Sequence, residues 1–302
     1  MYAVIDLGVS ITRLCIFDYA DNDLDMVYDE RKSFNLIDHM QDGVLTSRGM
    51  EKACDIINDL KNFAQEFGTS VIYLIAFEPL YSAGNKDQVI DILKNNTGLS
   101  PDIREEGEKE MFGFAAISRN NSFDGLIINI SLNTTRFLEF KGKSIENSII
   151  MPVGCLNLYK DNVKALIPSK KELKKMQDLL TEKLKKLKLN TGGGFDFVYA
   201  YGDTAGAALE LSRMVLFAPD GENTVPAENI RMLLKQVRKN SMETLQLIYA
   251  TVPEMILTII PGLVILDQCL QIYKANGILV DEYGTYAGYL MQNNIIPEIN
   301  CK

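Results

Sequence analysis

Two strand–turn–strand segments hold the residues of this chain that are best suited to bind phosphate, residues 5–14 and residues 128–137. In the first segment an apolar strand ends in Asp6, and Gly8 follows within the turn. An aspartate can hold a divalent cation, a glycine lets the backbone approach an anion closely, and the amides of the turn can point at that anion. Two such turns that face each other would form a phosphate clamp.

The second turn lacks the two residues that give the first turn its chemistry. Asn129 stands where the first turn has Asp6, and residues 128–137 contain no glycine. The amide of asparagine carries no charge and is a weaker ligand for magnesium than a carboxylate. Leu132 adds an apolar side chain, and the Cβ atoms of residues 131–133 obstruct the close approach of a phosphate. The sequence therefore predicts one intact half and one weakened half of the clamp.

The composition is that of a globular protein and excludes several classes of function. A chain of 302 residues with 47% apolar and 24% charged residues suits two domains of ordinary size. The formal net charge of −9 argues against nucleic acid as a partner. The single histidine, His39, leaves almost nothing from which to build a zinc site or a Ser-His-Asp triad.

We expect a cytoplasmic protein that is not inserted in a membrane. The five cysteines are scattered and lack paired spacing, as in proteins that keep their thiols reduced. The most apolar stretch, residues 255–266, carries Thr258 and Pro261 and is too short to cross a bilayer. The N-terminus enters a strand pattern at once, with neither a basic region nor the cleavage site of a signal peptide.

The order of the predicted elements is repeated, which indicates two α/β lobes with a cleft between them. The first copy has strands at 2–7, 12–19, 24–33 and 70–76 and helices at 47–67, 86–96 and 108–118. The second copy has strands at 125–131, 135–141, 144–151, 195–201 and 278–280 and helices at 169–188, 204–217, 226–239, 241–249, 253–275 and 283–292. The predicted domains are residues 1–122 and 123–302, with the last helix either in the second lobe or packed back on the first.

The helix predicted at residues 169–188 is unusually basic for so acidic a chain. It follows a capping box of Ser169 and Glu172, and its leucines recur at helical spacing. Lysine stems can cover apolar surface while their ammonium groups stay in water. We favour such a solvated helix face over the alternative, a patch that binds a polyanion.

Several short motifs follow one another along the chain. Residues 6–14 match the pattern Asp-x-Gly-Ser-Asn-Ser-x-Arg-Leu at Asp6, Gly8, Arg13 and Leu14. Residues 106–111 match Ser-Gly-x-x-Glu-Ala at Gly107 and Glu110, and residues 283–288 keep a Tyr-Gly-x-x-x-Gly element. In these motifs, and in their order, the chain resembles the short, two-domain form of the exopolyphosphatase and guanosine pentaphosphate phosphohydrolase family.

This resemblance implies two ribonuclease H-like lobes with a central cleft, the α/β fold of actin, sugar kinases and the Hsp70 ATPase. It implies that Glu110 activates water for attack on a terminal phosphoryl group and that Asp6 and Asn129 hold magnesium. The phosphate-binding residues that it implies are Gly8, Val9, Ser10, Arg13, Asn133, Thr134, Gly202 and Thr204.

The chain departs from the family motifs at positions that carry charge. Tyr81 replaces an arginine of the family, and Asp203 adds a negative charge to a turn that should accept phosphate. We therefore favour an exopolyphosphatase-like protein with weakened or absent hydrolysis that binds a phosphorylated ligand or a partner protein. The alternatives are an active magnesium-dependent exopolyphosphatase or guanosine polyphosphate phosphohydrolase with Glu110 as base, and an ATPase or sugar kinase of the same fold.

The expected partner is a phosphorylated small molecule or polyphosphate. Neither nucleic acid nor a membrane is expected as a partner, and a homodimer is left open.

Overall fold

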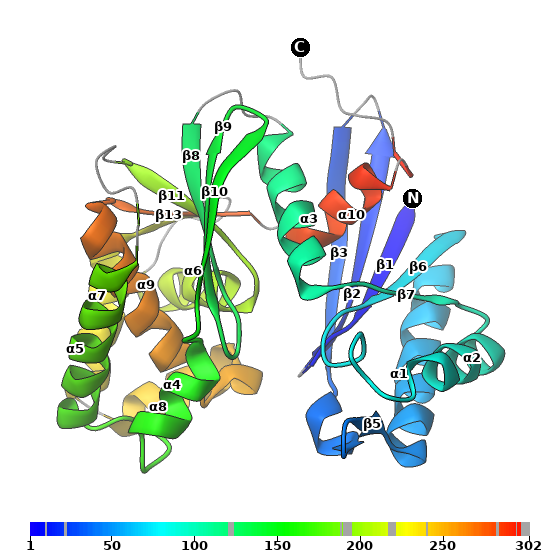
Figure 1. Cartoon of the computed structure of the whole chain (residues 1–302), viewed down its shortest axis with the longest axis horizontal. Helices are drawn as coiled ribbons and strands as arrows, with labels where there is room; N and C mark the ends of the chain where they lie inside the picture. Colours follow the sequence, from blue (N-terminus) through cyan, green and yellow to red (C-terminus); the bar gives the residue numbers. More distant parts are fainter. Residues whose placement is uncertain are drawn as a thin grey trace. The chain divides into compact units, whose positions relative to one another are not determined.

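The computed structural model describes residues 1–9, 11–20, 23–119, 124–187, 189, 195–216, 222–239, 241–281, 284–293 and 295–296. The chain forms two compact units, one of Met1–Arg119 with Thr285–Lys302 and one of Asn120–Gly284 (Figure 1). The C-terminal helix is therefore part of the first unit, although it follows the whole second unit in sequence.

The first unit is built on a mixed sheet with the strand order β3-β2-β1-β6-β7. Its strands are β1 (Tyr2–Leu7), β2 (Ile11–Ala20), β3 (Asp23–Ser33), β6 (Val71–Ala76) and β7 (Pro101–Ile103). The first three pair antiparallel, whereas β6 and β7 run parallel to β1. Parallel neighbours need long crossover connections, and these contain α1 (Ser47–Glu66) and α2 (Lys86–Thr97). The short elements η1 (Leu36–His39), β4 (Met40–Gln41) and β5 (Val44–Leu45) lie between β3 and α1.

The two faces of this sheet have different partners. Along β1, Ala3, Ile5 and Leu7 are buried in one core cluster with α1 and α2. Successive side chains of a strand point to opposite faces, so Asp6 points away from that core. On the face of Asp6 lie α3 (Glu106–Ser118) and α10 (Gly284–Gln292), drawn green and red in Figure 1. These two helices touch so closely that a Cβ at Gly288 would overlap the backbone of Phe112.

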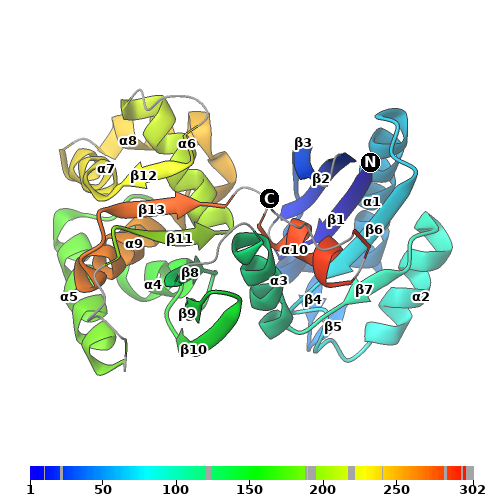
Figure 2. The ribbon, with the colours of Figure 1, turned by 90° about the horizontal axis from the view of Figure 1, so that it is seen from above.

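The second unit repeats this plan in a mixed sheet with the strand order β10-β9-β8-β11-β13-β12. Its strands are β8 (Asp124–Ile130), β9 (Thr135–Lys141), β10 (Ser144–Met151), β11 (Phe197–Tyr201), β12 (Thr224–Pro226) and β13 (Gly277–Val280). Strands β8, β9 and β10 pair antiparallel, β11 and β13 continue the sheet in parallel, and β12 closes its edge antiparallel to β13 (Figure 2).

The helices of the second unit pack around a central apolar helix, α9 (Ile259–Tyr273), which is buried along its length. The others are α4 (Cys155–Asn162), α5 (Lys170–Lys186), α6 (Asp203–Leu216), α7 (Ala227–Lys239) and α8 (Ser241–Thr251), with the short η2 (Pro253–Met255) before α9. Helix α5 turns its leucine face to the core, with Leu173, Leu180 and Leu184 buried. No helix in the described ranges is both long and apolar enough to cross a membrane.

Both units are α/β and share the β-β-β-α-β-α order of a ribonuclease H-like fold, as the sequence predicts. The main element that the sequence analysis missed is α4. Its N-cap is Gly154, whose side chain can offer no cap, and the helix has only 8 residues. Such a helix lacks the start signal and the length on which a prediction from sequence depends.

Candidate functional site

The first predicted turn places Asp6 at the end of β1 in a buried position, with 3% of the residue exposed. The hydroxyl of Tyr286, from α10, donates a hydrogen bond of 3.1 Å to its Oδ2 atom. The ammonium of Lys109, from α3, lies 3.9 Å from the same oxygen. Because a buried carboxylate needs a hydrogen bond and a counter-charge, these two residues explain how Asp6 is accommodated.

A second contact fixes the position of Lys109. Its Nζ atom lies 4.9 Å from the centroid of the Phe77 ring, a distance at which an ammonium is attracted by the aromatic face. Phe77 is itself 4% exposed, whereas the side chain of Lys109 remains 30% exposed. The ammonium thus lies between a buried ring, a buried carboxylate and solvent.

Arg13, predicted to bind phosphate, is directly opposite Asp6 in the β1–β2 pairing. Its guanidinium binds Asp29 of β3 through two hydrogen bonds, Nε to Oδ1 at 2.6 Å and Nη2 to Oδ2 at 2.8 Å. It also lies over the ring of Tyr286, 5.1 Å from the centroid. Burial alone would raise the pKa of Asp29, but the hydrogen bond and charge of Arg13 outweigh burial and lower it. The positive charge of Arg13 is therefore directed to Asp29.

The turn after β1 is tight at Gly8, the residue predicted to let a phosphate approach the backbone. A Cβ at Gly8 would lie 2.5 Å from the carbonyl oxygen of Ile11, so a larger residue does not fit there without a shift of the backbone. The carbonyl of Val9 accepts a hydrogen bond of 2.8 Å from the amide of Leu36. Ser10, the third predicted residue of this turn, lies outside the described residues.

The predicted base, Glu110, is half-buried on α3 and follows Lys109 directly. Helix α3 begins with a capping box in which Glu105 is the N-cap residue. Tyr81, which replaces an arginine of the family, donates a hydrogen bond of 2.6 Å from its hydroxyl to Glu105. Where the family has a cationic arginine, this chain therefore has a tyrosine that holds the start of the helix carrying Glu110.

In the second unit, the turn between β8 and β9 presents carbonyl groups to the N-terminus of α4. The amide of Cys155 donates to the carbonyl of Ser131 at 3.0 Å, and that of Leu156 donates to the carbonyl of Leu132 at 2.8 Å. The side-chain amide of Asn157 donates to the carbonyl of Asn133 at 2.9 Å. Helix N-terminal amides are good anion ligands, but here they are occupied by the turn.

The same turn is also held by contacts with the core of the unit, within the turn itself and with Gly154. The side chain of Leu132 packs against the apolar core of the unit, and the carbonyl of Thr134 accepts a hydrogen bond of 2.9 Å from the amide of Ser131. A Cβ at Gly154 would lie 2.5 Å from the amide nitrogen of Asn133. Asn133 and Thr134, both predicted to contact phosphate, therefore lie in a turn that is closed onto α4.

The remaining predicted residues of this unit lie where β8 and β11 end and α6 begins, and each is in close contact with neighbouring residues. Asn129 donates from Nδ2 to the carbonyl of Tyr201 at 3.1 Å and accepts from the hydroxyl of Ser131 at 3.2 Å. Gly202 has φ +89°, and a Cβ there would lie 2.9 Å from Nδ2 of Asn129. Thr204 is 2% exposed, and its hydroxyl donates to the carbonyl of Ile130 at 3.4 Å. These contacts connect β8, β11 and the start of α6.

The predicted metal ligands do not offer a site that fits a resident divalent cation. Asp6 belongs to the first unit, where its Oδ2 atom already faces a tyrosine hydroxyl and an ammonium. Asn129 belongs to the second unit, and both ends of its amide are used by neighbours. Across the described ranges, no group of three or more His, Cys, Asp and Glu side chains is placed to hold a metal. Magnesium prefers carboxylates and water in a near-octahedral shell, and Asp6, the one carboxylate among the two predicted ligands, already faces an ammonium.

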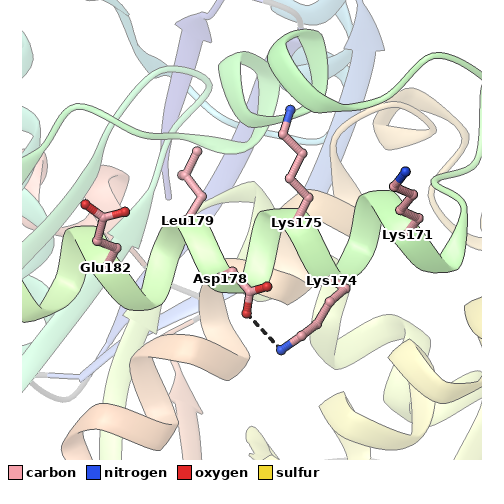
Figure 3. Close-up of a pocket in the computed structure, with 6 residues that line it drawn as sticks. All are labelled: Lys171, Lys174, Lys175, Asp178, Leu179 and Glu182. Atoms are coloured by element: carbon pink, nitrogen blue, oxygen red, sulfur yellow. Dashed lines mark ion pairs between the residues drawn. The ribbon is translucent and has the colours of Figure 1, made fainter.

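A shallow depression on α5 is lined by side chains of that one helix, with both signs of charge (Figure 3). Lys174 and Asp178 form an ion pair of 2.8 Å there. The lining residues are Lys171, Lys174, Lys175, Asp178, Leu179 and Glu182. None of the residues predicted to bind phosphate contributes to it, and its mixed charge agrees with the interpretation of α5 as a solvated face.

Lys109 and Tyr286 are the neighbours of Asp6 that the sequence analysis does not predict. Lys109 lies within the acidic run from Glu105 to Glu110, in which the motif singles out the carboxylate of Glu110 and not the lysine before it. Tyr286 lies within the Tyr-Gly-x-x-x-Gly element, at one of its unspecified positions. Only the packing of α3 and α10 on β1 brings both side chains to Asp6.

Comparisons with known proteins agree with the fold. The model of the Ppx/GppA phosphatase family matches residues 15–294. A crystal structure of the Ppx/GppA family member of Aquifex aeolicus superposes with a TM-score of 0.80 at 19% identity, covering 97% of either chain. An exopolyphosphatase from Cytophaga hutchinsonii superposes with a TM-score of 0.78 at 16% identity, covering 97% of this chain and 98% of that one. These structures share the fold. No curated protein sequence matches the chain.

Proposed function

Because this chain belongs to the Ppx/GppA phosphatase family, we propose that it binds a phosphorylated ligand but hydrolyses phosphoanhydrides weakly or not at all. Polyphosphate and guanosine polyphosphates are the ligands that the family suggests. Phosphatases of this family generally depend on a divalent metal, whereas the residues around Asp6 and Asn129 do not form a site that fits one.

The observation that carries this proposal is the closed turn at residues 131–134. Phosphoryl transfer depends mainly on positioned donors and on electrostatic stabilisation of the phosphoryl oxygens. In this chain the α4 amides bind carbonyl groups of the turn, and Leu132 packs on the core. The loss of one such donor can reduce the rate by about 10²–10³. The loss of several donors supports a protein that binds phosphate without efficient turnover.

The first unit supports ligand binding better than the second. Gly8 keeps the tight turn after β1, and Lys109 presents a partly exposed ammonium 3.9 Å from Oδ2 of Asp6, near the end of the same strand. An ammonium at this place can act as a point charge toward a phosphate. The ligand would then be held mainly by the first unit.

The active alternative rests on Glu110. A half-buried carboxylate on α3 could accept a proton from water while the water oxygen attacks a terminal phosphorus atom. The bond from that phosphorus to the bridging oxygen would break, and the shortened phosphate chain would leave.

Equilibrium dialysis tests the proposal, with guanosine pentaphosphate and medium-chain polyphosphate as probes and released phosphate assayed in the same samples. The expected result is saturable binding with little release over hours. Matched Glu110→Gln protein, which keeps the shape of the side chain, should bind the probes equally well. Rapid release that Glu110→Gln abolishes would contradict the proposal and establish the active alternative. An absence of binding to both probes would contradict both.

A further inference from the structure

We infer that Lys109 takes the place of a divalent cation at Asp6, so that the first unit binds phosphate groups without magnesium. This inference rests on the ligand binding proposed above and specifies its metal requirement.

The geometry around Asp6 gives the ammonium of Lys109 a defined place. Tyr286 donates to Oδ2 at 3.1 Å, and Nζ of Lys109 lies 3.9 Å from that atom. The centroid of the Phe77 ring lies 4.9 Å from Nζ, and this ring limits the movement of the ammonium on another side. The residues in contact, Tyr286, Lys109 and Phe77, come from α10, α3 and the segment after β6. The packing of these elements therefore sets the position of Lys109.

Magnesium and Lys109 compete for the same carboxylate. A magnesium ion binds a carboxylate oxygen at about 2.0–2.1 Å and keeps several waters around it. An ammonium about 4 Å from that oxygen would then repel the ion at short range, where screening by solvent is weak for so buried a group. Asp6 is 3% exposed, which leaves little room for the water shell of the ion.

The lysine also makes the site acceptable to an anion. A buried carboxylate alone would repel a phosphate, whereas the pair of Asp6 and Lys109 carries no net charge. The ammonium has three donors and remains 30% exposed, so it can bind Asp6 and a phosphoryl oxygen together. The hydroxyl of Tyr286 donates to the same carboxylate and supports its charge.

Isothermal titration calorimetry of the full chain with inorganic tripolyphosphate tests this inference, in EDTA and in magnesium chloride. The proteins are wild type, Lys109→Met and the charge-conserving control Lys109→Arg, each checked by a thermal melt. Wild type should bind in EDTA. Lys109→Met should bind about tenfold or more weakly there, the effect of one lost charge-assisted hydrogen bond, and Lys109→Arg within about threefold of wild type.

Magnesium also binds free tripolyphosphate, so each variant is compared with wild type in the same buffer. The deficit of Lys109→Met should shrink in magnesium chloride, because the ion can then approach Asp6. Wild-type binding that requires magnesium would overturn the inference and leave the proposed function intact. Equal binding by wild type and Lys109→Met in EDTA would also overturn it.

A titration with Mn²⁺ alone tests the inference without any phosphorylated ligand. Free Mn²⁺ is followed by its electron paramagnetic resonance signal in the presence of wild type or Asp6→Asn. Equal, weak binding by the two proteins is expected. A site in wild type that Asp6→Asn removes would overturn the inference, whatever the outcome with tripolyphosphate.

Discussion

Tyr286 in the last helix of the chain donates its hydroxyl to Asp6 in the first strand, at 3.1 Å. The contact joins two residues that are 280 positions apart in sequence. It fixes α10 over the carboxyl end of β1, where the turn at Gly8 begins. The Oδ2 atom of Asp6 thereby faces a donor from the protein.

Replacement of Tyr286 by Phe should destabilise the protein by about 1–3 kcal/mol, because it leaves a buried carboxylate short of a donor. Urea unfolding measures the loss. Tyr289→Phe is a matched control, since Tyr289 lies on the same helix and donates to Asp102 at 3.1 Å. Asp102 is about a third exposed and also pairs with Arg104, so the control should lose less. Equal losses would contradict a special role of the Tyr286–Asp6 contact.

The ion pair of Arg13 and Asp29 should make stability depend on acid pH. The pKa of Asp29 is lowered from the ordinary value of 3.8, so the pair stabilises the folded state fully above that value. This contribution is lost as the pH falls below about 4 and toward the lower pKa of the folded state. Urea midpoints of Asp29→Asn should therefore fall less between about pH 4 and pH 2 than those of wild type.

Asp178→Asn provides the control for that acid series, because Asp178 pairs with Lys174 on the exposed face of α5. Exposed pairs contribute little to stability. Its midpoints should follow those of wild type across the acid range. An Asp29→Asn series that also follows wild type would show that the Arg13 pair does not produce the dependence.

Gly154→Ala should disrupt the contact between α4 and the turn at residues 131–134. The added Cβ would lie 2.5 Å from the amide nitrogen of Asn133, and overlaps of this kind cost about 1–3 kcal/mol. Gly107→Ala is the control, because no atom lies within 4 Å of its added Cβ on α3. That substitution should stabilise the helix by about 0.5–1 kcal/mol. Chemical unfolding gives both values, and an undisturbed Gly154→Ala protein would contradict the closed turn.

Cys155 should resist alkylation in the folded protein. Burial, together with the nearby charge of Asp203, raises the pKa of its thiol to about 12, so little thiolate exists at pH 8. Mass spectrometry after iodoacetamide treatment should find Cys155 unmodified in native protein and modified in denaturant. Rapid native labelling would show that the N-terminus of α4 opens away from the turn.

The repeated order of elements could be predicted because each helix and strand depends on a local pattern, such as the apolar run of β1 or the apolar stripe of α1. The surroundings of Asp6 could not be predicted in the same way. Lys109 and Tyr286 reach Asp6 only because α3 and α10 pack on β1. No spacing of residues in the sequence predicts that packing. Arg13 shows the same limit, since its phosphate role was inferred from a motif while its partner, Asp29, lies on a neighbouring strand.

The closed turn of the second unit was only partly predictable. The loss of glycine and of the acidic residue at Asn129 is visible in the sequence, and so is the apolar Leu132. The docking of α4 onto the turn is not, because the helix has no side-chain cap at Gly154 and is only 8 residues long. The contacts of its amides with the carbonyls of Ser131 and Leu132 depend on this docking and leave no signal in the sequence.

The rate of terminal phosphate release from polyphosphate, measured with enzyme in excess of substrate, tests most directly whether the chain has lost efficient hydrolysis. Wild type and Glu110→Gln should release phosphate at the same slow rate, with and without magnesium. A wild-type rate that exceeds that of Glu110→Gln by about a hundredfold or more would contradict the proposal, because a working base contributes about 10²–10⁴ to the rate.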